Sequence, residues 1–432
     1  MKKNNQNITE ISSVIFSTII LSFCVIHVNS STLYINPFLQ ITIVLLSILS
    51  LHLIDKKKEK IEKISSINII AFIVVLSSIT ISSTISNETH KSITRFVLIF
   101  GVSFFAFYIF RSSRNPQKLL QGLSISVILI TIVSTLYNIV MALYDFNLIN
   151  KTGYLTVTMN FAGIELHQNI AYRAFRLNQT NYYIQRFGGI FPNPNGMGIM
   201  SAMTFFLAYT STENKKIRMT IQAISLIGLI MSISRMGFLL FSTALIYYHL
   251  HHNRIRQIII SVMIIVLMLF LFGTATSTPA TIATPLKLTP ISQQELLQLS
   301  ERAQMISMAW QGFLEHWFVG VGYGVGAEYL FKESADVQAV HSVHLNAMLE
   351  TGIIGTLALF LIWLTPVFAT PTSNKRIEGR IDHRHVIAAL LFGLFFAEAF
   401  DLSVTRFHYI HIIFVFFIGC WFALGHVLKD KT

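Results

Sequence analysis

The sequence predicts an all-α, polytopic integral membrane protein with about twelve transmembrane helices. The chain has 432 residues, of which 53% are hydrophobic and 12% are charged, whereas a soluble domain carries roughly 25% charged residues. The apolar residues fall in blocks of about 20, the length that a helix needs to cross a hydrocarbon core about 30 Å thick. These observations exclude a soluble globular domain.

The apolar blocks divide the chain into spans and loops. Two expected loops, 144–194 and 275–344, are much longer than the others. They separate an N-terminal bundle of about five spans at 1–143, central spans at 195–274 and C-terminal spans at 345–432. The individual spans are expected at 11–29, 36–54, 64–84, 96–110, 122–143, 195–211, 219–234, 237–250, 257–274, 345–369, 386–402 and 409–428.

The basic residues indicate the orientation of these spans. With a cytoplasmic N-terminus, 21 of the 32 Lys and Arg residues fall in the short cytoplasmic segments. Cytoplasmic loops of membrane proteins are enriched in Lys and Arg, so we expect both termini in the cytoplasm and both long loops outside. The formal net charge of +12 therefore indicates contact with membrane lipid, and no nucleic-acid partner is expected.

The second long loop contains a stretch with helical periodicity. Between Glu295 and Trp317, apolar residues could line one side of a helix: Leu296, Leu299, Met305, Trp310, Phe313 and Trp317. Such a helix either lies on the outer leaflet of the membrane or packs on the helical bundle. Periodicity alone does not separate these two interpretations.

The first polar motif is Arg186-Phe-Gly-Gly-Ile-Phe-Pro-Asn-Pro-Asn195-Gly-Met-Gly, just before the span 195–211. Pro192 and Pro194 prevent a continuous helix, and Asn195 is expected to cap the helix that follows. A capped helix start with nearby glycines can bind an anion. The alternative is a tight turn that only leads into the span.

The second motif, Ser232-Ile-Ser-Arg235-Met-Gly237, separates two apolar blocks. Placing an arginine near hydrocarbon costs about 2.5–3.5 kcal/mol on insertion scales. Its planar guanidinium suits bidentate phosphate binding, so Arg235 is a candidate phosphate ligand. The alternative is an arginine that reaches lipid headgroups.

The third motif combines Arg302 with the glycine-rich segment Gly320-Val-Gly322-Tyr-Gly324-Val-Gly326. The glycines could let backbone N–H groups face a phosphate, although no strand precedes the segment and no Walker lysine follows it. Arg302 by itself is most simply a solvated charge. Tyr323 is a candidate to stack on a sugar ring.

The fourth motif, His341-Ser-Val-His344-Leu-Asn346-Ala-Met-Leu-Glu350-Thr-Gly352-Ile-Ile-Gly355, lies where the second long loop meets the span 345–369. A histidine near neutral pH can accept a proton from a hydroxyl group. The spacing of His341 and His344 also permits a zinc pair, but no third ligand cluster accompanies them, and no metal is expected. A histidine at a membrane boundary can equally be an ordinary interfacial residue.

Taken in order, these motifs resemble those of the O-antigen ligase and polymerase superfamily of bacterial envelope glycosyltransferases. The resemblance extends from about Arg186 to Gly355. The chain departs from the family pattern at Phe318-Val319, where proline is common, at Met236, and at Ser342, where asparagine is usual.

The resemblance implies a C-type glycosyltransferase architecture (GT-C-like) in the bacterial inner membrane, metal-independent and without a cofactor. It implies that Arg235 and Arg302 hold the pyrophosphate of an undecaprenyl-pyrophosphate-linked glycan donor. The proton acceptor is then His341, with His344 as the runner-up. The residues expected to contact substrate are Arg186, Asn195, His344, Asn346 and Tyr323.

The resemblance leaves the acceptor open. A ligase would transfer the glycan to lipid A-core, and a polymerase would transfer it to the next lipid-linked repeat unit; the later motifs favour a ligase. From a different class, a twelve-span transporter or flippase would place charged residues deep within several spans, with Glu398 and Asp401 as the main candidates. Large outer loops and short inner loops favour an enzyme.

Overall fold

A computed structural model describes most of the second half of the chain and part of the first. The described residues are 116–144, 155–161, 164–177, 180–191, 193–251, 304–330, 342–370, 383–399 and 408–429, with residues 74, 77–78, 81–82, 86 and 340. The expected spans 11–29, 36–54, 96–110 and 257–274 lie outside these residues, as does most of 64–84.

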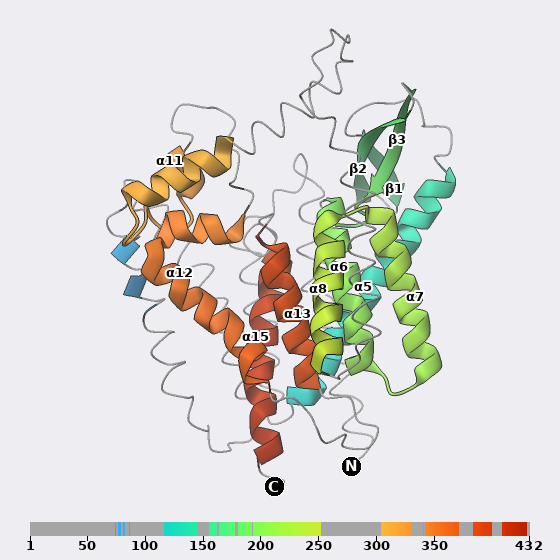
Figure 1. Ribbon diagram of the computed structural model, residues 1–432. Helices are drawn as coiled ribbons and strands as arrows, with labels where there is room; N and C mark the ends of the chain where they lie inside the picture. The colour runs from blue at the N-terminus through green and yellow to red at the C-terminus, as the bar shows by residue number, and fades with distance from the viewer. Residues whose placement is uncertain are drawn as a thin grey trace.

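The described part of the chain is mostly helical (Figure 1). Besides the helical residues 304–315, its helices are α5 (Pro116–Tyr144), α6 (Pro194–Ser211), α7 (Lys215–Ser232), α8 (Arg235–His251), α11 (Gly326–Leu330), α12 (Val343–Ala369), α13 (His383–Ala397) and α15 (His408–Lys429). All of these except α11 overlap an expected span, because a long apolar block is a local signal. By length and composition, residues Pro116–Val140 of α5 and the whole of α12 could cross a membrane.

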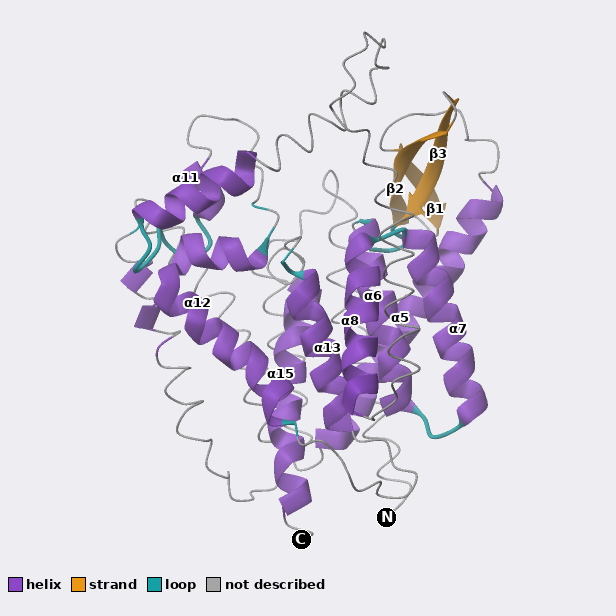
Figure 2. Ribbon diagram, viewed as in Figure 1, coloured by secondary structure: helices purple, strands orange, loops and turns teal. Residues whose placement is uncertain are grey.

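Residues 155–161, 164–177 and 180–187 form a β-sheet, so the expectation of an all-α chain is wrong for the first long loop. Three antiparallel strands pair in the order β1 (Leu155–Phe161), β2 (Ile164–Leu177), β3 (Thr180–Phe187) (Figure 2). In the register, Ile170 of β2 lies opposite Leu155 on one side and Phe187 on the other. The sequence of β1 alternates apolar and polar residues, which is the period of a strand and not of a helix.

The long helices alternate in direction. α6, α8, α12 and α15 begin at the end of the bundle that carries the sheet, called the sheet end below, and α5, α7 and α13 end there (Figure 1). Lys118, Lys215 and Arg384 stand in the first turns of α5, α7 and α13. These basic residues consequently lie at the end opposite the sheet.

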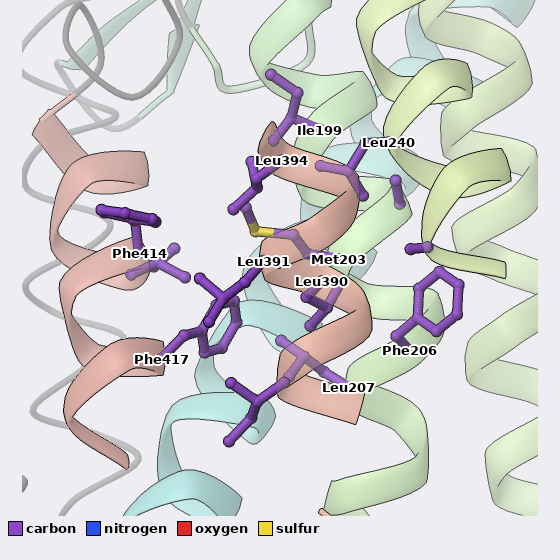
Figure 3. Packing of buried hydrophobic residues seen from close by; sticks show 14 of the residues in the cluster. Ile199, Met203, Phe206, Leu207, Leu240, Leu390, Leu391, Leu394, Phe414 and Phe417 are labelled. Atoms are coloured by element: carbon purple, nitrogen blue, oxygen red, sulfur yellow. The ribbon is translucent and has the colours of Figure 1, made fainter. Parts of the chain in front are cut away.

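Apolar side chains of α6, α8, α13 and α15 form the main core (Figure 3). One buried cluster includes Met203 and Phe206 of α6, Leu240 of α8, Leu391 of α13 and Phe417 of α15. α13 packs against α8 on one side and against α12 and α15 on the other. The core therefore joins the central helices to the C-terminal helices.

α12 is bent at Gly352, whose backbone angles are φ 64° and ψ −170°. Only glycine readily adopts this conformation. The bend divides the helix into a short arm, 343–351, and a long arm, 353–369. In Figure 1 the short arm runs across the sheet end and the long arm descends toward α15.

Candidate functional site

The turn after β3 leads directly into α6, and Asn193 caps that helix. The Oδ1 atom of Asn193 accepts a hydrogen bond of 2.8 Å from the Gly196 N–H. Pro194 is the first helical residue, a position that favours proline because an N–H there would have no helical partner. The expectation that Asn195 caps α6 is therefore wrong, since the cap is the residue before the proline.

Arg186, Asn195, Ser232 and Ser234 meet at the sheet end and are called the arginine cluster below. Nη2 of Arg186 donates to Oδ1 of Asn195 at 2.8 Å, and Nε of Arg186 donates to the backbone oxygen of Ser232 at 3.3 Å. The hydroxyl of Ser234 donates to the same Asn195 oxygen at 3.3 Å. The cluster thus brings together the first and second sequence motifs.

The turn between α7 and α8 places Arg235 at the first position of α8. α7 ends at Ser232 and is capped by Ile233, which has a left-handed backbone conformation with φ 44°. Ser234 then caps α8, because its hydroxyl oxygen accepts a hydrogen bond of 3.1 Å from the Gly237 N–H. Arg235 is exposed and follows Ser234 of the arginine cluster directly.

α6 and α8 approach each other closely just below the arginine cluster. A Cβ atom on Gly237 would lie 2.6 Å from the carbonyl carbon of Gly198 and 2.7 Å from its oxygen. Backbone atoms cannot move out of the way by rotation, as the end of a side chain can, so position 237 requires glycine. It holds the starts of the two helices side by side next to Arg186.

The arginine cluster is a place of concentrated positive charge. The start of each helix carries a partial positive charge of about half an elementary charge, and two such starts meet here. The guanidinium of Arg186 adds a full charge there, and Arg235, which is exposed, is the first residue of α8. Arginine binds phosphate oxygens through paired hydrogen bonds. The arrangement can therefore hold an anion such as a phosphate or pyrophosphate group.

The glycine-rich segment of the third motif packs on the bend of α12. The N–H groups of Val321 and Gly322 donate to the backbone oxygens of Leu349 at 2.9 Å and Glu350 at 3.1 Å. The N–H of Gly326 donates to the carboxylate of Glu350 at 3.2 Å. The expectation that these N–H groups face a phosphate is wrong, because those of Val321 and Gly322 pair with backbone oxygens at the bend and that of Gly326 pairs with the Glu350 side chain.

Tyr323 and Asn346 belong to this second region and not to the arginine cluster. Tyr323 packs against Ala358 of the long arm of α12. Burial raises the pKa of Tyr323, and the nearby Glu350 carboxylate raises that pKa further. The side-chain oxygen of Asn346 lies beside Gly326, where a Cβ atom would be 3.1 Å from it. The third and fourth sequence motifs are therefore neighbours.

His344 lies among aromatic rings. Its ring centroid is 4.5 Å from that of Phe395 in α13, 4.9 Å from Phe360 and 6.2 Å from Trp363. Its Nε2 atom is buried and has no hydrogen-bond partner in the described part of the structure. These ring contacts pack His344 of α12 against Phe395 of α13.

The remaining two expected site residues, His341 and Arg302, lie outside the described residues. His341 directly precedes Ser342, whose hydroxyl oxygen caps α12 by accepting a hydrogen bond of 3.3 Å from the Leu345 N–H. Arg302 comes two residues before the helical residues 304–315.

The sequence motifs did not single out Ser234 and Glu350 as site residues. In the structure, Ser234 contacts Asn195, and Glu350 contacts the glycine-rich segment. A serine directly before the helical stretch that begins at Arg235 fits the N-cap pattern, which is the signal that would have found Ser234. The role of Glu350 had a weaker signal, an acidic residue two positions before the glycine that bends α12. Its contact with the glycine-rich segment could not be read from spacing.

In the part of the chain that the structure describes, the protein is mostly helical, two helices are long and apolar enough to cross a membrane, and a candidate anion site lies at the sheet end. Residues 221–360 match the sequence model of a family described as O-antigen ligase. This match confirms the resemblance that the motifs predict. It includes Arg235, Arg302, His341 and His344, whereas Arg186 and Asn195 precede it. No curated protein matches the chain.

Proposed function

We propose that the protein is a glycosyltransferase that moves a glycan from undecaprenyl pyrophosphate to an acceptor hydroxyl group on the periplasmic face of the bacterial inner membrane. The observation that carries the proposal is the arginine cluster, which joins Arg186 and Asn195 to the start of α8 at Arg235. Two arginines and two helix starts suit the negative pyrophosphate of such a donor. The family match over residues 221–360 supports the same class of enzyme.

The proposed reaction is a single displacement at the anomeric carbon. The acceptor oxygen attacks that carbon while its proton passes to His341, and the bond to the pyrophosphate oxygen breaks. The electron pair leaves with undecaprenyl pyrophosphate, and Arg235 and Arg302 stabilise the charge that develops there. A general base of this kind contributes about 10²–10⁴-fold to the rate. Attack opposite the leaving group inverts the anomeric centre, and the proposed step uses neither a metal nor a cofactor.

The proposed acceptor is lipid A-core, which makes the protein an O-antigen ligase; the alternative is a polymerase that extends a lipid-linked repeat unit. A transporter or flippase has less support. In the described helices that overlap expected spans, charged residues stand near the helix ends or, for Glu350, before the bend of α12. Glu398 follows the end of α13, and its backbone oxygen accepts a hydrogen bond of 2.9 Å from the Val343 N–H. Asp401 lies outside the described residues.

The proposed orientation places the sheet end in the periplasm and both termini in the cytoplasm. Support comes from the alternating helices and from the basic residues that start α5, α7 and α13 at the opposite end. A membrane-impermeant thiol reagent added outside should label the Asn160→Cys chain and not the Lys58→Cys chain. Outside labelling at position 58 would put every candidate residue in the wrong compartment.

The decisive experiment is transfer by the purified full-length chain in liposomes. The liposomes contain an undecaprenyl-pyrophosphate-linked glycan, either alone or together with lipid A-core. Glycan bound to core supports a ligase, and longer lipid-linked glycan without transfer to core supports a polymerase. A chain that unfolds cooperatively on heating, and is therefore folded, but consumes no donor in either mixture refutes the proposed function.

A further inference from the structure

The helical residues 304–315 present three different faces. The face against the protein is apolar and buried, and it consists of Met305, Ala309 and Phe313. A second face is polar and exposed, and it consists of Gln304, Ser307, Gln311 and Glu315. Between them, and continuing just beyond the helix, is an apolar face about half exposed: Ile306 (47%), Trp310 (49%), Leu314 (55%) and Trp317 (56%).

Trp317 lies level with the bend of α12. Its backbone oxygen accepts a hydrogen bond of 2.8 Å from the N–H of Ile353, the first residue after the bend. At about 1.5 Å per residue, the long arm from Ile353 to Ala369 is about 25 Å long, close to the hydrocarbon thickness of about 30 Å. When this arm crosses the membrane, the bend and Trp317 therefore lie near one boundary of the hydrocarbon.

Exposed apolar residues occur on both sides of this boundary. On the long arm of α12, Leu357 and Leu361 are exposed. Beside the bend, Phe318 is exposed as well. Its peptide unit touches Gly352, where a Cβ atom would lie 2.6 Å from the Val319 nitrogen. The spanning arm and the apolar face are thus joined by a direct backbone contact.

We propose that the apolar face inserts into the membrane leaflet at the sheet end, which is the outer leaflet in the proposed orientation. Tryptophan is enriched at membrane boundaries because it combines an apolar ring with a polar N–H. A helix that lies in the interface buries its apolar side among the lipids and keeps its polar side in water. A lipid surface suits this face better than a second protein copy, because the face ends at the bend where the lipid boundary passes.

Insertion gives the second long loop a fixed depth. The loop is then held twice, by lipid at Trp310 and by the hydrogen bonds of the glycine-rich segment to the bend. In the sequence, Arg302 precedes this helix by two residues, and a lipid-linked donor would carry its pyrophosphate at the level of the membrane surface. This consequence rests on the proposed function, whereas the insertion itself does not.

Tryptophan fluorescence of the full-length chain in liposomes tests the insertion. The chain has four tryptophans, and Trp363 and Trp421 are buried. Lipids brominated on the acyl chains near the headgroups should quench the parent chain. The Trp310→Phe/Trp317→Phe chain should lose most of this quenching. Equal quenching of the two chains would overturn the proposal.

A matched pair of added tryptophans locates the water boundary on the helix. In the Trp310→Phe/Trp317→Phe chain, Leu314→Trp adds a reporter on the apolar face and Gln311→Trp adds one on the polar face. We expect brominated lipid to quench the reporter at 314 and acrylamide in water to quench the reporter at 311.

Two results of this pair would contradict insertion. Strong acrylamide quenching at position 314 would show that the apolar face lies in water. Protection of position 314 from both quenchers would show that protein covers the face, as in a dimer. Lipid quenching at 314 supports insertion even if none of these chains transfers glycan, so the insertion and the proposed function fail separately.

Discussion

Replacing Asn195 with aspartate should separate the stability of the chain from its activity. The carboxylate can accept the two hydrogen bonds, from Arg186 and Ser234, that the amide oxygen accepts in the parent chain. It also places a negative charge in the first turn of α6, where the helix dipole favours anions by about 0.3–1 kcal/mol. We therefore expect Asn195→Asp to unfold at the same temperature as the parent chain or slightly above it.

The same charge should weaken binding of an anionic donor at the arginine cluster. One elementary charge about 6 Å from a bound phosphate, at an effective dielectric constant of about 20, opposes binding by about 3 kcal/mol. Because about 1.4 kcal/mol corresponds to a tenfold change, transfer at low donor concentration should fall about 10²-fold. Pairing of the new carboxylate with Arg186 acts in the same direction, since it neutralises one of the donor's expected partners.

The assay measures the transfer rate at donor concentrations below KM, together with thermal unfolding of each purified chain. Asn214→Asp is the matched control. Asn214 caps α7 at the end opposite the sheet. Its side-chain oxygen accepts hydrogen bonds from the N–H groups of Lys216 and Ile217. This control makes the same charge change at a helix start and should transfer at the parental rate. Full transfer by Asn195→Asp at normal protein levels would refute the assignment of the pyrophosphate to the arginine cluster.

Three further predictions concern other parts of the site. Gly352→Ala should lower the free energy of unfolding by roughly 2–5 kcal/mol, because the bend requires a glycine conformation and the backbone of 318–319 blocks a Cβ atom. In thermal unfolding, Gly312→Ala is its control, since a Cβ there meets side-chain atoms and no backbone atoms. His344→Phe should keep both its stability and its transfer rate. His341→Ala should lose at least about 10²-fold in transfer rate. A folded but inactive His344→Phe chain would assign the role of general base to His344. Arg235→Lys should lose most of its transfer, because a point charge does not replace a bidentate fork, and an unchanged rate would remove Arg235 from the mechanism.

The positions of the helices could be predicted from the sequence. α6 occupies Pro194–Ser211 where a span was expected at 195–211, and α12 occupies Val343–Ala369 where one was expected at 345–369. A membrane helix satisfies its backbone hydrogen bonds within its own segment. The apolar run that such a segment needs in lipid can therefore be recognised from the local sequence, without knowledge of any other part of the chain.

Two other local features of the sequence indicate the strand β1 and the cap of α6. The alternation from Leu155 to Phe161 predicts a strand, whereas the predicted all-α fold class has no strand in the loop 144–194. The pair Asn193-Pro194 matches the start of a helix with proline at its first position. Asn193 is then the cap, and the side chain of Asn195 can accept the hydrogen bond from Arg186. Both corrections follow from turn and strand chemistry that acts within a few residues.

The sequence by itself determined that this protein is built from apolar helices and that its polar motifs resemble those of one enzyme superfamily. Only the tertiary structure decided which motifs meet. Arg186 reaches Ser232 across 46 positions of sequence, and the glycine-rich segment reaches the bend of α12, whereas His344 turns toward Phe395. A helix is held by hydrogen bonds between residues four apart, so its signal is local. A contact between distant polar groups depends on distances and directions that exist only once the helices have packed, as at the backbone contact of Gly198 with Gly237.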